Sequence, residues 1–400
     1  MSLAVNTSST PPASFRPGRW LSRPLFIGND IYRRSTFGAK HPLSVPRVPA
    51  TIDLCRALGW LPDGAYIESG PASPAEIVRF HDPDYLRALR EGERTLALSP
   101  SDRERFNLGR LENPIHDTMY SRPAISAGAV LKAAEILRTV DRGVVYSPAG
   151  GTHHGRPDRA SGFCYFNDLA LGILRLKDLG FSRVLYLDFD AHHGDGVQDA
   201  FAGDASVFTI SIHEERRWPF SGQLTECEGG TACNIPVPRG LRDSEFRLIV
   251  DEIVMPLVAS YAPEVLVLQC GADALADDPL SRMELTNTVI WDAVAKLMVA
   301  VPRMLVTGGG GYNPWSVARC WSGVWGTLNG HAIPDPLPVS AQAVLRDLTW
   351  NRAGGRNPPD HWFETMADAP VQNAVRREVR DLIAVAHKFY VNNQKNNITI

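Results

Sequence analysis

The sequence lacks the features of a secreted or membrane protein. Its six cysteines are scattered through 400 residues without a Cys-x-x-Cys pair, which favours reduced thiols and a cytoplasmic setting over a disulfide framework. No apolar run reaches the roughly 18 residues of a membrane span. The first residues are rich in Ser, Pro and Thr and contain no apolar signal-peptide core, so we expect a flexible lead-in over residues 1–22.

The sequence also lacks an excess of charge and any internal repeat. The net charge is −3 and no basic block is present, so we expect no direct nucleic-acid binding. A repeat of about 20–50 residues, which would indicate a solenoid or propeller, is absent. With 44% hydrophobic and 21% charged residues the composition is that of a globular protein, and 400 residues allow one large domain or two.

Short apolar runs alternate with helical patterns along most of the chain. The runs have the composition of buried parallel strands and cover 143–147, 184–188, 207–212, 265–269 and 304–307. Helix-period apolar positions occupy 124–139, 167–179, 243–262 and 286–301. This alternation predicts an α/β/α fold with a mostly parallel central sheet. Ligands bind at the carboxyl ends of strands in such sheets, so we expect one active site built from several post-strand loops.

The pattern changes after about residue 331. An irregular stretch with Pro and Trp precedes an apolar stripe that predicts a helix packed on the body, formed by Val371, Val375, Val379, Leu382 and Ala386. The last residues are polar, and we expect a frayed tail over 391–400.

The most unusual segment runs from Asp188 to Asp195, at the end of an apolar run. Alternate residues of a strand share a face, so Asp188, Asp190 and His192 would emerge together where the strand ends. Burying two carboxylates and an imidazole unpaired would cost several kcal/mol, which favours a metal site. The alternative is a set of solvated loop residues.

Two adjacent histidines, His153 and His154, follow another strand and a glycine pair. Such a pair is often an ordinary surface feature, but next to a metal-bearing strand it is suited to general acid/base chemistry. Each imidazole needs an acid to orient it, and Asp188 and Asp195 are the spare carboxylates of the neighbouring segment.

An acid also follows the strand at 265–269. Asp273 would be a helix N-cap or loop residue in most proteins. Here it would complete a two-Asp, one-His ligand set with Asp190 and His192, which leaves coordination positions open as in catalytic sites.

A run of four glycines, 308–311, leads to Tyr312. A phosphate cradle is disfavoured because no Lys-Ser/Thr follows and the run does not match Gly-x-Gly-x-x-Gly. Close backbone approach would instead let the Tyr312 hydroxyl point into the site and donate a hydrogen bond to an oxyanion.

These motifs, in this order, resemble the histone deacetylase family. They are the His153-His154 pair and the segments 160–168 (ASGFCYFND), 188–196 (DFDAHHGDG), 271–273 (GAD) and 308–312 (GGGGY). The resemblance covers about residues 25–328 and is closest in pattern to bacterial histone-deacetylase-like and acetoin-utilisation proteins. It implies the arginase/deacetylase fold in a single domain over residues 23–390. It also implies zinc-dependent hydrolysis of an N-acyl amide, typically N6-acetyl-lysine, with release of acetate.

The resemblance assigns roles to the residues. One zinc ion per chain would be held by Asp190, His192 and Asp273. The catalytic set would be His153, His154, Tyr312, Asp188 and Asp195. Zinc would polarise the amide carbonyl and lower the pKa of its bound water. His154 would move the water proton to the leaving amine, His153 would act electrostatically, and Tyr312 would help to hold the oxyanion.

Family members also bind a monovalent cation, K+ or Na+, near the zinc. The matching residues are Asp188, Asp190, His192, Ser211 and Ile212. A second cation site would involve Phe201 and Val207.

The resemblance further implies a narrow tunnel for the acyl-lysine. Its residues would be Gly162, Phe163, Trp218, Phe220, Leu280 and Glu112. Phe163 alone would be interpreted as a core residue. Either Trp218 or Phe220 supplies the second aromatic wall, and Glu112 stands where the family often has a rim Asp.

Several alternatives stay open. The substrate could be an acetylated polyamine, another small acylated amine or a longer acyl-lysine. Position 280 is a leucine and not an acid that would bind a cationic polyamine, which disfavours the first of these. An arginase-like two-metal enzyme would need an acid where Leu275 stands, and a catalytically silent acyl-lysine sensor would usually have lost a ligand, the base or the tyrosine. The native metal, zinc or ferrous iron, and the oligomeric state, a homo-oligomer included, are open.

Overall fold

One parallel sheet forms the centre of the protein. The computed structural model describes residues 19–34, 37–38, 40–371 and 373–392. The sheet has eight strands in the order β2-β1-β3-β8-β7-β4-β5-β6, and every pair is parallel. The strands are β1 Leu25–Gly28, β2 Tyr66–Glu68, β3 Gly143–Ser147, β4 Val184–Asp188, β5 Val207–Glu214, β6 Ala232–Val237, β7 Val265–Gln269 and β8 Arg303–Thr307. The predicted fold class is confirmed.

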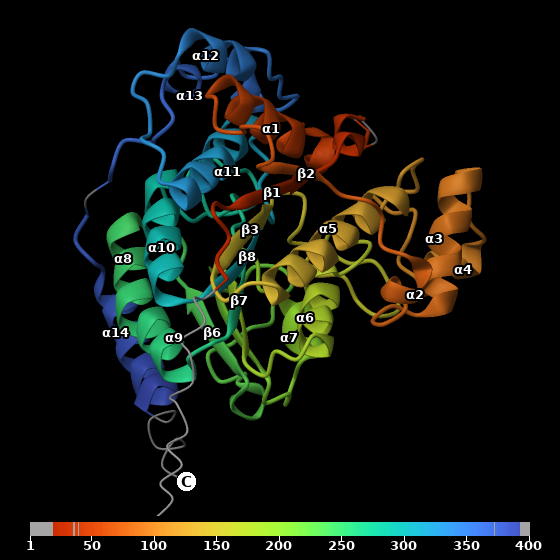
Figure 1. Cartoon of the computed structure of the whole chain (residues 1–400), viewed down its shortest axis with the longest axis horizontal. Helices are drawn as coiled ribbons and strands as arrows, with labels where there is room; N and C mark the ends of the chain where they lie inside the picture. The colour runs from red at the N-terminus through yellow and green to blue at the C-terminus, as the bar shows by residue number, and fades with distance from the viewer. Residues whose placement is uncertain (1–18, 35–36, 39, 372, 393–400) are drawn as a thin grey trace, which may run out of the picture.

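Helices cover both faces of this sheet (Figure 1). One face carries α5 Ser121–Arg138, α6 Asp168–Asp178 and α7 Asp195–Ala200, which share one hydrophobic cluster with the sheet. The other face carries α1 Arg47–Ala57, α8 Asp243–Ile249, η4 Val250–Val254, α9 Met255–Tyr261, α10 Asn287–Ala300 and α11 Pro314–Asn329. Apolar strands buried between two helical layers explain why the central strands read as continuous hydrophobic runs.

The remaining elements lie around this core. The helices α2 Pro74–Ile77, α3 Pro83–Thr95 and α4 Pro100–Arg105 stand to one side of the sheet (Figure 1), and α2 and α3 share a smaller hydrophobic cluster with α5 and α6. Short 3-10 turns occur at η1 Asp30–Arg33, η2 Pro42–Ser44, η3 Glu228–Gly230 and η5 Ala353–Gly355. The last described elements are α12 Val339–Arg346, α13 His361–Glu364, α14 Arg377–Ala386 and the π-helical η6 His387–Val391.

The bounds of the elements differ from the sequence predictions in several places. The strands β3, β4 and β7 have the predicted bounds, whereas β5 continues to Glu214. The strands β1, β2 and β6 were not predicted; β2 and β6 are edge strands, and β6 contains Pro236. The predicted helix 243–262 is interrupted by the π-helical η4.

The C-terminal region also requires a correction. The helix α14 begins at Arg377, so Val371 and Val375 lie before the helix and not on its apolar stripe. The stretch after residue 331 is less irregular than predicted, since it contains α12 and α13. Of the predicted lead-in and tail, residues 1–18 and 393–400 lie outside the described residues.

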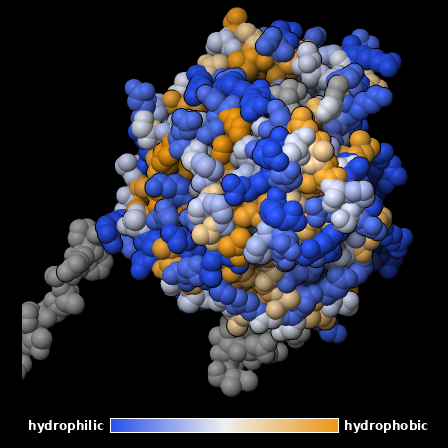
Figure 2. Space-filling model, turned by 90° about the vertical axis from the view of Figure 1, so that its right-hand side faces the viewer, coloured by the Kyte–Doolittle hydropathy of each residue, from blue (hydrophilic) through white to orange (hydrophobic). Residues whose placement is uncertain are grey.

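The surface and the cysteines agree with a globular body. On the face shown in Figure 2, hydrophilic residues predominate and hydrophobic residues are interspersed among them. All six cysteines lie within the described ranges, and none of them forms a disulfide. Among the helices of the described residues, none has the length and hydropathy needed to cross a membrane.

The order of the strands brings the unusual segments together. The strands β3, β8, β7 and β4 are consecutive in the sheet, and their carboxyl ends lie at one edge. The loops that follow them carry the histidine pair, the glycine run, Asp273 and the Asp188 segment, respectively. Four loops that are far apart in the sequence therefore enclose one space.

Candidate active site

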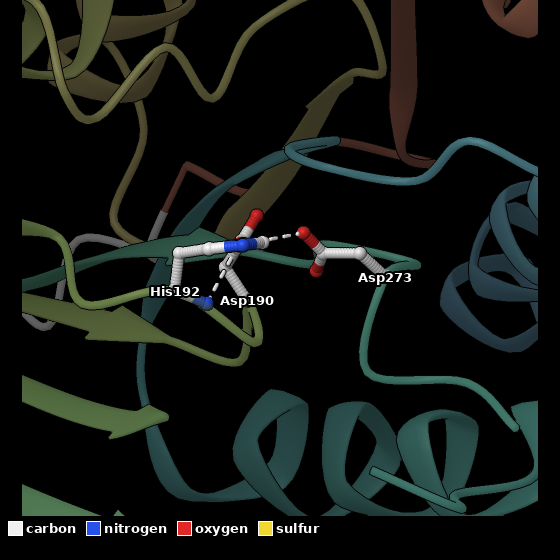
Figure 3. A group of neighbouring side chains, drawn as sticks. All are labelled: Asp190, His192 and Asp273. Carbon is white, nitrogen blue, oxygen red and sulfur yellow. Dashed lines mark hydrogen bonds and ion pairs between the residues drawn. The ribbon is translucent and has the colours of Figure 1, made fainter. Parts of the chain in front are cut away.

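Two loops bring three metal-ligating side chains to one point. Asp190 and His192 follow β4, and Asp273 follows β7 (Figure 3). One donor atom from each residue lies within 4.8 Å of the other two. His192 Nδ1 is 2.9 Å from Asp273 Oδ2 and 3.1 Å from Asp190 Oδ1. Two carboxylate oxygens and one imidazole nitrogen are donors that zinc accepts, and three protein ligands are the number found in catalytic zinc sites.

The surrounding groups fix these carboxylates. Asp190 Oδ2 accepts hydrogen bonds from Gln269 Nε2 at 2.8 Å and from the Gly310 backbone N–H at 2.6 Å. Asp273 Oδ1 accepts from the Ala191 N–H at 2.9 Å. A Cβ atom at Gly310 would lie 2.1 Å from Asp273 Oδ2, so only glycine permits this approach. The opposite oxygens, Asp190 Oδ1 and Asp273 Oδ2, are the ones that face His192, which leaves them directed at a shared point.

The first histidine of the pair lies close to the same point. His153 Nδ1 is 2.7 Å from Asp188 Oδ2, and the Tyr186 hydroxyl donates to the same oxygen at 2.5 Å. The other ring nitrogen, Nε2, is 3.9 Å from Asp190 Oδ1. Burial lowers the pKa of His153, but the carboxylates of Asp188 and Asp190 outweigh it and raise that pKa to about 9.

The second histidine has a different environment. His154 Nδ1 is 2.7 Å from Asp195 Oδ1, and Asp195 also pairs with Arg156. The two imidazole rings, His153 and His154, have centroids 3.9 Å apart. Burial, together with the neighbouring His153, lowers the pKa of His154 to about 3. His154 is therefore neutral at neutral pH and its Nε2 is available as a proton acceptor.

The tyrosine of the glycine run closes the opposite side. Tyr312 is 7% exposed and lines the same cavity as His154, Asp190 and His192. Its backbone N–H donates to Asp278 Oδ2 at 2.6 Å. Burial raises the pKa of the Tyr312 hydroxyl well above its usual value, so the group stays protonated and can donate.

Two aromatic side chains border the approach to the site. Phe163 lies with its ring centroid 5.9 Å from that of Tyr312, and Trp218 lies 4.6 Å from His154. Of the two candidates for the second wall, Trp218 is therefore the one beside the histidine, whereas Phe220 is 70% exposed further out. A Cβ atom at Gly162 would come within 2.5 Å of the Trp218 ring, so glycine lets this wall approach.

The remaining predicted tunnel and cation residues lie as follows. Glu112 Oε1 accepts from the Gly162 N–H at 2.5 Å, and Leu280 lines the mouth with Trp218. In the register of β4 and β5, Ser211 pairs with Asp188, and its hydroxyl lies 2.9 Å from His213 Nδ1. Ile212 follows in the same strand and is fully buried.

Sequence reasoning missed four side chains at the site. Gln269 holds Asp190, Arg156 pairs with Asp195, and Asp278 holds the Tyr312 backbone. Arg47 Nη1 donates to the Gly309 carbonyl at 2.6 Å, which fixes the glycine run. Arg47 comes from α1, more than two hundred residues earlier, so no local pattern could reveal it. The position of Asp278, five residues after Asp273 on the same loop, was the one available signal.

Comparisons with known proteins agree on one family. The model of the histone deacetylase domain matches residues 41–328. Histone deacetylase 9 of Arabidopsis thaliana is 37% identical over 309 residues, which are 76% of this chain and 72% of that protein. The acetoin utilization protein AcuC of Bacillus subtilis is 32% identical over 355 residues, 84% of this chain and 91% of that protein. The crystal structure of a histone deacetylase homologue from Aquifex aeolicus has a TM-score of 0.86 and 34% identity, covering 91% of this chain and 99% of the other.

Proposed function

The chain belongs to the histone deacetylase family and is a deacetylase, and on that premise we propose that it hydrolyses N6-acetyl-lysine in proteins or peptides with one zinc ion per chain. The observation that carries the proposal is the convergence of Asp190, His192 and Asp273 within 4.8 Å, next to a histidine pair and a buried tyrosine. Acetate and the free lysine amine would be the products.

The residues fit a zinc ion held by Asp190 Oδ1, His192 Nδ1 and Asp273 Oδ2. Zinc bound there would supply polarisation of the amide carbonyl and activation of a water molecule. Three protein ligands leave room for both water and substrate. Ferrous iron accepts the same donors, so the metal itself is to be identified by analysis of the purified protein.

Proton transfer falls to His154 in this proposal. Its Nδ1 is held by Asp195, which leaves Nε2 to take a proton from the attacking water and to deliver it to the leaving amine. Asp195 itself is tied to Arg156, so the imidazole is fixed in orientation. His153, held by Asp188, would place positive charge beside the reacting carbonyl.

The oxyanion would be stabilised by Tyr312. Burial keeps its hydroxyl protonated, and Tyr312 lines the cavity that Asp190 and His192 also line. A hydrogen bond from such a donor forms with the charge that develops on the carbonyl oxygen, and its loss typically costs about 10²–10³ in kcat.

The walls of the approach support an acyl-lysine over a bulkier or more polar group. Phe163 and Trp218 would grip the aliphatic stem of the lysine, and Leu280 is apolar at the mouth. Acetylated polyamines and longer acyl-lysines are the alternatives.

For the chain as a whole, we propose a single catalytic domain over residues 23–390 in a cytoplasmic setting. We also propose a K+ or Na+ site formed by Asp188, Ser211 and their neighbours.

Acetate release from a panel of acylated amines tests this proposal. The panel should contain an acetyl-lysine peptide, acetylspermidine and a longer acyl-lysine peptide. We expect the acetyl-lysine peptide to give the highest kcat/KM and the His154→Ala protein to release no acetate at a measurable rate. Turnover of acetylspermidine above the peptide would overturn the assignment of the substrate, and turnover of none of the three would overturn the proposed activity.

A further inference from the structure

A wide cavity lies outside the tunnel and is continuous with it. It has a volume of about 710 Å³ and is lined at its base by His154, Phe163 and Tyr312. Its outer wall includes Leu111 and Phe220, which are 77% and 70% exposed. An acetyl-lysine side chain occupies only the base of such a space, so a neighbouring part of the substrate would enter the rest of it.

Phe220 is held in a backbone conformation that is unfavourable for its side chain. Its φ angle is 64°, in the left-handed region where glycine is favoured. The loop is nevertheless fixed: the Phe220 N–H donates to the Arg217 carbonyl at 2.7 Å, and Arg217 binds Glu214 and the Leu280 carbonyl. The strained backbone therefore presents an apolar residue that is 70% exposed to solvent, so burial of the ring does little to offset the cost of the strain. Strained backbone of this kind is typical of residues that contact a ligand at the edge of a site.

The charged groups of the cavity disfavour a polycationic substrate. Arg216 and Arg217 both line it, and Arg217 is already paired with Glu214. Of the described residues that line the cavity, Glu112 alone has a carboxylate, and this carboxylate accepts the Gly162 N–H. A second ammonium group of a polyamine would therefore meet two arginines and an acid that is already engaged.

We propose that Phe220 and Leu111 bind an apolar side chain of the residue next to the acetyl-lysine in a polypeptide. The inference rests on the proposed function and narrows its substrate class. Two large exposed apolar side chains at the rim of one cavity favour binding of an apolar group. Because the acetyl-lysine enters the tunnel below this rim, the group at the rim belongs to the residue beside it in the polypeptide.

Matched peptides test the inference. One peptide carries leucine on each side of the acetyl-lysine, and the other carries serine there; Nα-blocked acetyl-lysine amide serves as the minimal substrate. We expect kcat/KM to be about tenfold higher for the leucine peptide, with most of the difference in KM. The Phe220→Gly variant suits the left-handed backbone and removes only the ring. Together with Leu111→Ser it should erase the preference, so that the two peptides have equal kcat/KM, whereas the control Val299→Ser, at an equally exposed position in α10, should keep it.

The outcomes separate this inference from the proposed function. Equal kcat/KM for the two peptides, or an unchanged preference in the Phe220→Gly, Leu111→Ser protein, would overturn the inference while deacetylation stands. If the minimal substrate is not deacetylated either, the proposed function fails. The inference is then decided by fluorescence anisotropy of the two labelled peptides, in which equal affinities refute it.

Discussion

The hydrogen bonds of Asp278 give a test of how Tyr312 is positioned. This carboxylate is 5% exposed and accepts two backbone N–H groups, that of Tyr312 at 2.6 Å and that of Leu280 at 2.9 Å. Asparagine has the same shape but only one acceptor oxygen, so Asp278→Asn would turn an N–H group of its amide towards one of the two backbone donors. The protein would then hold an unsatisfied buried donor next to the catalytic tyrosine.

The expected decrease in kcat follows from the cost of the backbone N–H that loses its acceptor in Asp278→Asn. Leaving a buried donor without a partner costs about 1–3 kcal/mol. If the whole cost falls on the position of Tyr312 in the transition state, kcat decreases by roughly 5- to 150-fold. KM should change less than kcat, because of the three tunnel residues Phe163, Trp218 and Leu280 only Leu280, at the mouth of the tunnel, makes a hydrogen bond to Asp278.

A double-mutant cycle with Tyr312→Phe distinguishes positioning from general destabilisation. We expect Asp278→Asn to lower kcat in the wild-type background and to have no further effect once the Tyr312 hydroxyl is removed. The neighbouring Asp277→Asn is the matched control. Within the described part of the chain its side chain accepts only from Trp362 Nε1, at 3.2 Å, which the asparagine oxygen can still do, so kcat should stay at the wild-type value. Full additivity of Asp278→Asn and Tyr312→Phe, or loss of bound metal in Asp278→Asn, would refute the reasoning.

Two further predictions concern catalysis and stability. Tyr312→Phe should lower kcat by about 10²–10³ with little change in KM, measured by acetate release, and a full rate would contradict the role of the hydroxyl. His81 is 1% exposed, its Nε2 accepts the Asn167 N–H at 3.0 Å, and burial lowers its pKa to about 4. The unfolded chain, with a histidine pKa of about 6.5, binds more protons below that pH, so the contribution of His81 to stability is complete above about pH 6.5 and is lost as the pH falls towards 4, by up to roughly 3 kcal/mol. His81→Gln keeps the acceptor, and urea denaturation should show a smaller dependence of unfolding free energy on pH for this variant; an unchanged dependence would contradict the assignment.

The fold could be predicted from the sequence where burial is two-sided. Strands such as β4 and β7 are covered by helices on both faces, so their apolar runs mark them with the correct bounds. The edge strands β2 and β6 could not be found in this way. The polar Asn234 and Pro236 interrupt the apolar run of β6, and β2 has only three residues, none of which is buried. The family and the enzyme class are confirmed by the comparisons.

Some residues of the site could be predicted from the sequence and others could not. Side chains with metal-binding or proton-transfer chemistry, such as Asp190 and His153, stand out in an apolar context, and the structure brings the predicted ones together. Asp278 and Arg156 could not be assigned because single charged residues in loops are ordinary until the tertiary structure shows what they hold. The choice between Trp218 and its neighbour Phe220 depended on the path of the loop, which no periodicity encodes.

The metal dependence of acetate release tests the central claim most directly. Protein dialysed against a chelator should release no acetate from an acetyl-lysine peptide, and addition of zinc should restore activity in proportion to bound metal up to one ion per chain. Asp273→Ala should abolish both the binding of zinc and the recovery of activity. Full activity in protein that elemental analysis shows to be metal-free, or a requirement for two ions per chain, would contradict the account.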